Sequence, residues 1–106
     1  EAIKILQQGY EKVISLGDPE WTMASYFHLG LANERTAATI LNAPWPKDLT
    51  TTQREEFFIT LQNRGLPYED RAIIMYQKVL SFERASPKSG KEWLSLAKAH
   101  LKKLMQ

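Results

Sequence analysis

Cysteine is absent from this chain of 106 residues. Its absence excludes disulfide bonds, thiolate zinc sites and cysteine nucleophiles together. It leaves the compartment open, because a reducing cytoplasm and an oxidising periplasm both tolerate a cysteine-free chain. Long apolar runs are also missing, so we expect no direct insertion into a membrane. The formal net charge is only +2, which by itself indicates neither a nucleic acid nor an anionic membrane as a partner.

Side chains that could support catalysis are scattered. The two histidines, His28 and His100, have no histidine or carboxylate three or four residues away, where a helix would bring metal ligands together. The acid pairs at 55–56 and 69–70 fall in the first turns of predicted helices, where the helix dipole favours carboxylates. The sequence has no glycine-rich phosphate loop and no Gly-x-Ser-x-Gly elbow. We therefore expect no metal, no cofactor and no enzymatic activity.

The composition that remains is that of one globular domain. Hydrophobic residues make up 43% of the chain and charged residues 25%, the balance of a soluble protein. A chain of this length is one domain's worth, so we interpret residues 1–106 as a single unit. It begins at Glu1 without an initiator Met or a signal peptide, and we expect it to be a piece of a longer protein.

Apolar residues recur at three- and four-residue steps along the chain, a spacing that predicts helices and no strands. The first helix is expected over about 1–16, before Gly17. The run Asp18-Pro19-Glu20 opens the second with an N-cap acid and a first-turn proline. That helix ends near Leu41, because the prolines that follow cannot continue it.

Three more helices are predicted in the second half of the chain. Thr50 with Gln53, or Thr52 with Glu55, fits the capping-box spacing at the start of the third. Gly65 marks its end, and Pro67 stands where a fourth helix would begin and run to about residue 85. Ser89 with Glu92 is a capping box for the fifth. Short connections between helices predict antiparallel neighbours.

Part of this pattern resembles the tetratricopeptide repeat, a family of paired helices. The second helix of that repeat has a small residue, an aromatic residue four later and a small or apolar residue three after that, as in Ala72, Tyr76 and Val79. Its first helix has an aromatic residue, a leucine three later and Gly or Ala directly after, as in Tyr26, Leu29 and Gly30, and in Trp93, Leu96 and Ala97. The small residue would let a paired helix approach closely. Tyr26 and Trp93 are 67 residues apart, close to two repeats of about 34 residues.

The resemblance implies an all-α fold of about five antiparallel helices, stacked as a fragment of a right-handed α-solenoid. One step must be irregular, because the second and fifth segments both match first helices while the fourth matches a second helix. The pattern is also similar to tetratricopeptide proteins of predatory and gliding bacteria. That similarity implies a bacterial periplasm or cell envelope, with the cytoplasm as the alternative.

In this family the first helices line a groove that binds extended or helical peptides. By motif match, the groove-facing residues here are Phe27, Leu31, Glu34 and Arg35 near Tyr26, and Leu94, Lys98, Leu101 and Lys102 near Trp93. The apolar members have a second interpretation, burial by neighbouring helices. Trp45, between two prolines, is a further candidate, either as an exposed anchor for a partner or as a side chain folded back over the core.

The sequence thus predicts a non-enzymatic module that binds or scaffolds another protein, through a peptide or partner helix in a shallow groove. Two alternatives stay open: a structural spacer or homo-oligomerisation segment, and a helical accessory domain of a larger enzyme. Uncovered apolar faces on the end helices would favour self-association or contact with missing flanking repeats. We expect no nucleic acid as a partner, because no aromatic residues are interleaved with the basic residues near the C-terminal end.

Overall fold

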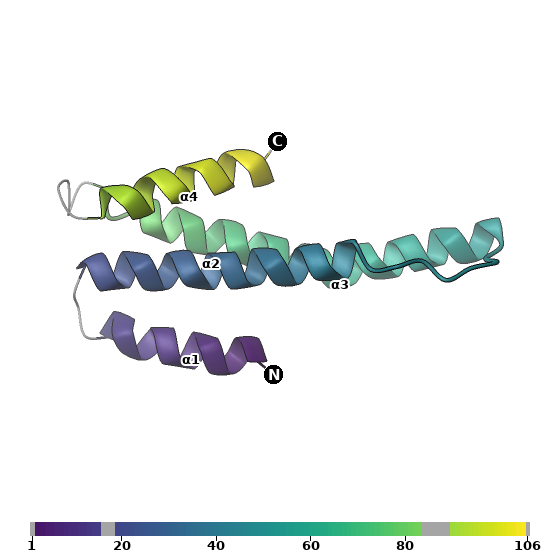
Figure 1. The fold of residues 1–106 in the computed structure, drawn as a ribbon, viewed down its shortest axis with the longest axis horizontal. Coiled ribbons are helices and arrows are strands. Elements are labelled where there is room, and N and C mark those ends of the chain that lie inside the picture. Colours follow the sequence, from purple (N-terminus) through teal and green to yellow (C-terminus); the bar gives the residue numbers. More distant parts are fainter. Residues whose placement is uncertain (1, 16–18, 84–89, 106) are drawn as a thin grey trace.

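A computed structural model of the protein describes residues 2–15, 19–83 and 90–105. These residues form four α-helices and no strand, which confirms the all-helical class. The helices are α1 (Ala2–Ser15), α2 (Pro19–Leu41), α3 (Thr51–Leu80) and α4 (Lys91–Leu104). Consecutive helices run antiparallel, as predicted, and α2 lies between α1 and α4 (Figure 1). Helix α2 is the central element, since it contacts each of the other three.

Local sequence signals set most of the helix ends. The Thr50 hydroxyl accepts a hydrogen bond from the backbone N–H of Gln53 at 3.1 Å, and the Gln53 side chain accepts one from the Thr50 N–H at 3.0 Å. This predicted capping box satisfies amide groups that would otherwise lack partners at the start of α3. Helix α2 begins at Pro19 and ends at Leu41, as predicted. Helix α4 begins after Gly90, whose φ of 76° suits a glycine, while the predicted cap Ser89 lies outside the described residues.

The predicted break between a third and a fourth helix is wrong, because α3 runs through it without interruption. Gly65 is buried against α2, and a Cβ there would lie 2.6 Å from both Cγ and Cδ2 of Leu41. Pro67 cannot donate to the carbonyl of Asn63, but both residues are exposed, so water can reach that carbonyl. The glycine is therefore a crossing point of two helices and not a helix end. Four helices are described where about five were predicted, and the tetratricopeptide-like solenoid is not confirmed.

The core lies where α2, α3 and α4 meet, a region that we call the proximal bundle (residues 19–40, 68–83 and 91–104). Its largest fully buried side chains are Tyr76, Met23 and Val79. Gly30 makes room for the Tyr76 ring, because a Cβ at Gly30 would lie 2.6 Å from Tyr76 Cε1. The small residue of the Tyr26-Leu29-Gly30 motif was predicted to let another helix approach closely, and Gly30 does so. The buried cluster consists of Met23, Phe27, Ala72, Tyr76, Val79, Leu94, Ala97 and Leu101.

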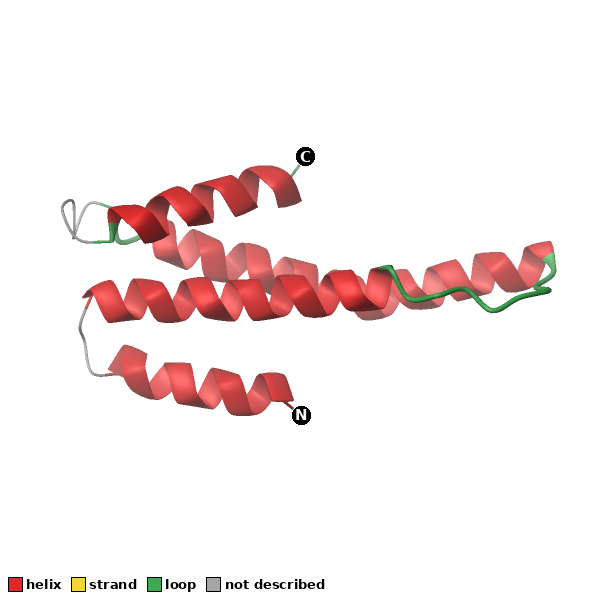
Figure 2. Ribbon diagram, viewed as in Figure 1, coloured by secondary structure: helices red, strands yellow, loops and turns green. Residues whose placement is uncertain are grey.

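The opposite end of the molecule is a thin extension that we call the distal arm (residues 42–66). It consists of the loop after α2 and the first half of α3, and the loop runs alongside the helix (Figure 2). Helix α3 has 30 residues and α4 has 14, so at 1.5 Å per residue they span about 45 Å and about 21 Å. The molecule is accordingly elongated, with extents of 55 × 29 × 15 Å.

Candidate functional site

A polar cluster around Glu34 joins three helices inside the proximal bundle. The Glu34 carboxylate, on α2, accepts hydrogen bonds from the Tyr76 hydroxyl of α3 at 2.9 Å and from Lys103 Nζ of α4 at 2.9 Å. His100 Nδ1, also on α4, lies 2.8 Å from the Glu34 oxygen that Tyr76 contacts. Both carboxylate oxygens are therefore occupied from within the protein, and the Glu34 side chain is only 12% exposed.

The electrostatics of this cluster keep Glu34 and Tyr76 in their ordinary protonation states. Burial by itself raises the pKa of Glu34, but the hydrogen bonds from Lys103, His100 and Tyr76 outweigh it, so the pKa lies below its usual value. Burial, and then the hydrogen bond to Glu34, raise the pKa of Tyr76 far above its usual range. At neutral pH Glu34 is a carboxylate and Tyr76 a phenol. In these states the hydrogen bond between Tyr76 and Glu34 ties α3 to α2.

The sequence-predicted groove residues do not form one surface. Phe27 and Leu94 are 5% and 7% exposed and belong to the buried core. Leu101 is buried with them, and Leu31 is half-buried against the same cluster. Phe27 and Leu94 thus show burial by neighbouring helices, the second interpretation given for them. The Phe27 ring of α2 has its centroid 5.6 Å from those of both Tyr76 of α3 and Trp93 of α4, so both helices cover it.

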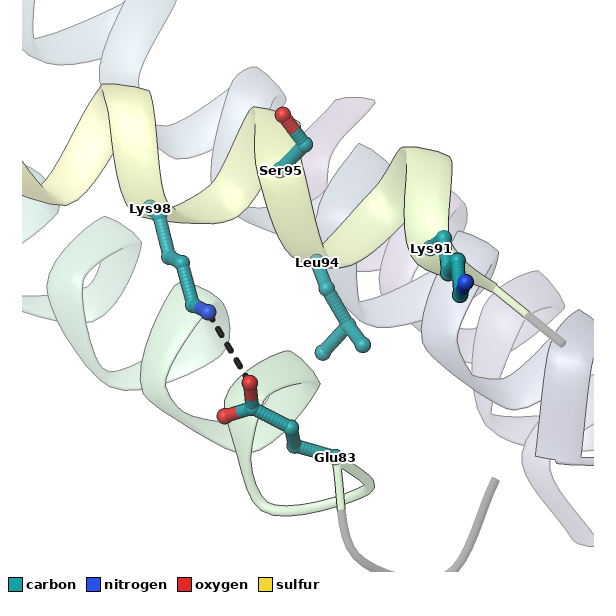
Figure 3. A pocket seen from close by; sticks show the side chains of 5 residues that line it. All are labelled: Glu83, Lys91, Leu94, Ser95 and Lys98. Carbon is teal, nitrogen blue, oxygen red and sulfur yellow. Dashed lines mark hydrogen bonds and ion pairs between the residues drawn. The ribbon is translucent and has the colours of Figure 1, made fainter. Parts of the chain in front are cut away.

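The charged residues predicted for the groove, apart from Glu34, lie outside the core. Lys98 pairs with Glu83 at 2.9 Å, and both side chains are more than half exposed. The pair borders a surface recess of about 410 Å³ in which Leu94 and Lys98 point from α4 toward the turn that carries Glu83 (Figure 3). Exposed ion pairs of this kind contribute little, about 0–1 kcal/mol. Arg35 and Lys102 are exposed on α2 and α4.

Trp45 lies far from the other predicted residues, on the distal arm. Its ring meets that of Phe57 edge to face, with centroids 5.0 Å apart. The side chain keeps 44% of its surface exposed. The contact holds the loop against α3 and leaves much of the indole open to solvent.

Sequence reasoning missed three exposed apolar side chains on the distal half of α3. Phe58, Ile59 and Leu66 are 51%, 55% and 42% exposed. We call these three residues the distal stripe. Ile59, Leu66 and the half-buried Ile73 are each seven residues apart, a spacing that puts them on one face of a helix. That spacing of seven residues could have revealed the stripe in the sequence. Apolar residues at such spacing are more often part of a buried core, so the spacing alone does not indicate exposure.

The described residues contain neither a cluster of metal ligands nor a membrane-spanning helix. No set of three or more His, Asp or Glu side chains among them is arranged to hold a metal ion. None of the described helices combines the length and the hydropathy needed to cross a membrane.

Comparison of the chain with protein-family models, with curated proteins and with solved structures gives no match. The resemblance to the tetratricopeptide repeat therefore stays a prediction from the motif residues.

Proposed function

We propose that this chain is a non-enzymatic protein-interaction module that binds a peptide or partner helix on the uncovered face of its distal arm. The observation that carries the proposal is the difference in length between α3, with 30 residues, and α4, with 14. Beyond the end of α4 none of the described helices covers the distal stripe, and its side chains stay 42–55% exposed. Grouped apolar side chains on one surface are typical of sites that bind proteins.

Trp45 supports binding by the distal arm but on another side of α3 than Leu66, because its contact Phe57 lies about 180° from Leu66 around the helix. Tryptophan is enriched among the residues that dominate binding energies at interfaces. Here it stands on the arm that carries the stripe, and its contact with Phe57 limits the freedom of the ring. A side chain that is already ordered loses less entropy on binding.

The Glu34 cluster supports a structural role for the proximal bundle. Its carboxylate is bonded to groups of α3 and α4, and the directions of the pKa shifts keep Glu34 ionised and Tyr76 protonated. We accordingly assign the proximal bundle to folding and the distal arm to binding.

The proposal is tested by affinity capture from a lysate of the source organism with the immobilised chain. Leu66→Glu puts a charge on the distal stripe, whereas Ile74→Glu puts the same charge on an exposed α3 residue off the stripe, which is 48% exposed. We expect at least one prey that is lost with Leu66→Glu and kept with Ile74→Glu, both variants having wild-type helix content by circular dichroism. If both variants retain the same preys, the distal arm is not the binding surface.

A further inference from the structure

The chemistry around the distal stripe identifies the class of partner, an inference that rests on the proposed function. The first step concerns position. At the C-terminal end of α4, Leu104 and Lys103 line a pocket of about 270 Å³ together with Glu69 of α3 and Ala38 of α2. The face of α3 that α4 covers thus continues past the end of α4, by way of Glu69, to the distal stripe.

The second step concerns charge. At about 100° per residue, Glu55, Glu69 and Asp70 lie within about 60° of Leu66 on the α3 helix. Arg64 and Arg71 lie on other sides, about 160° and 140° from Leu66, whereas Arg54 lies one turn before Phe58 and about 40° from it. Around Leu66 the uncovered face of α3 is therefore apolar with an acidic border. A partner that covers it must bring positive charge to that border to match the carboxylates.

The third step concerns α4, a helix of this protein that packs through apolar residues and forms ion pairs through lysines. Helix α4 has lysines at four of its 14 positions and one acidic residue, Glu92. It buries Leu94, Ala97 and Leu101. Its Lys103 pairs with Glu34 of α2 at 2.9 Å, and Lys98 pairs with Glu83 beyond α3 at 2.9 Å. A basic amphipathic helix is thus the kind of element that packs on this side of the α2–α3 pair.

We infer that the partner of the distal arm is a basic amphipathic helix that docks on α3 in line with α4. Its apolar residues cover Phe58, Ile59 and Leu66, and its Lys or Arg side chains reach Glu55, Glu69 and Asp70. The uncovered length from residue 58 to residue 70 corresponds to about 18 Å, or about three to four turns of a partner helix. Recognition combines an apolar stripe with matched charge, the mode of helix-in-groove binding.

The test uses a fluorescent 14-residue helical peptide with leucines at i, i+3, i+4 and i+7 and lysines at both edges of that stripe. A matched peptide has glutamates in place of the lysines. Binding to the whole chain is followed by fluorescence anisotropy. We expect the lysine peptide to bind, the glutamate peptide to bind at least about tenfold more weakly, and higher salt to weaken the lysine peptide.

Matched variants locate the site. Leu66→Ser removes apolar contact and is expected to weaken the lysine peptide about tenfold, whereas Ile74→Ser, off the stripe, leaves it unchanged. Glu55→Gln with Asp70→Asn removes two border charges and is expected to weaken it about fivefold. Glu11→Gln with Glu92→Gln changes the net charge equally on α1 and α4, away from the arm, and is the control. Equal loss in the two charge variants overturns the acidic border as the recognition element.

Three other results separate this inference from the proposed function. If the glutamate peptide binds as well as the lysine peptide, the partner chemistry is wrong although the arm still binds a helix. If neither peptide binds while prey capture depends on Leu66, the proposed function stands and the basic helix is rejected. If the chain alone forms a dimer in the ultracentrifuge that Leu66→Ser converts to monomer, a second copy covers the stripe and the inference fails.

Discussion

The proximal bundle and the distal arm share one helix, α3, but they differ in how they bury it. In the proximal bundle the side chains of Tyr76 and Val79 are completely buried. In the arm Phe58 and Ile59 are more than half exposed, and among the described arm residues only Leu61 and Gly65 are buried. Burial of apolar surface is the main favourable term in folding. We conclude that the bundle supplies most of the stability. The arm is free to keep exposed apolar residues, to which we have proposed that a partner binds.

The strongest test of this difference compares two aromatic residues of the same helix. Tyr76→Ala should cost about 3–5 kcal/mol of unfolding free energy, because it leaves a cavity in the core and breaks the bond to Glu34. Phe58→Ala should change it by less than about 0.5 kcal/mol, since the ring is half exposed. Urea denaturation followed by circular dichroism measures both. Similar costs at the two positions would show that the arm is part of the cooperative core.

Two glycines sharpen the comparison. Gly30→Ala drives a methyl group into the buried Tyr76 ring, which has no space to move, and should cost about 3 kcal/mol. Gly65→Ala meets the Leu41 side chain, which is half-buried and can shift, so the cost should be nearer 1 kcal/mol. Thermal unfolding of the two variants gives the order. A larger loss from Gly65→Ala would mean that the junction of the arm is packed more rigidly than the bundle.

Pro67 stands at the join of the two regions and tests the continuity of α3. In one uninterrupted helix, Pro67→Ala restores a backbone donor to the Asn63 carbonyl and should stabilise the protein by about 2 kcal/mol. If Pro67 instead opened a separate helix, the proline would suit its position and the substitution would be neutral or destabilising. The midpoint of urea unfolding distinguishes the two.

The last prediction concerns pH and belongs to the bundle alone. The folded pKa of Glu34 is below its usual value, so the stability from its ionised form is present above pH 4.5 and is lost as pH falls through the folded pKa. Glu34→Gln should therefore cost about 1–2 kcal/mol at pH 7, and the gap to wild type should close in acid below the folded pKa. Urea titrations at a series of pH values measure this gap. A gap that stays constant with pH would show that the charge of Glu34 is not what stabilises the cluster.

Several parts of the fold follow from sequence because their signals are local. The proline at position 19, the prolines after Leu41 and the box of Thr50 with Gln53 act within a few residues, and each predicted boundary was found. Gly65 and Pro67 led to a wrong prediction of a helix break because their signals are also local. Their local meaning is a helix end, but packing of α3 on Leu41 outweighs it, as tertiary context often outweighs propensity.

The site was harder to predict because its contacts are distant in sequence. Glu34 was identified as a candidate, yet its partners Tyr76, His100 and Lys103 are 42, 66 and 69 residues away. Spacing rules within one helix cannot find them. Phe27 and the residues of the distal stripe are equally apolar in sequence. Only the length and position of α4 decide which of them is covered.

The unequal burial along α3 also sets how its amide protons exchange with solvent. Amides near Tyr76 and Val79 are held in the core, so we expect them to exchange only when the whole chain unfolds. Amides near Thr50 lie in the first half of α3, where a loop runs alongside the helix. We expect local fraying to expose them to solvent far more often than the amides near Tyr76. Pro67 has no amide and leaves the Asn63 carbonyl without its helical donor. One continuous helix should therefore show a gradient of protection factors, with a step at its proline.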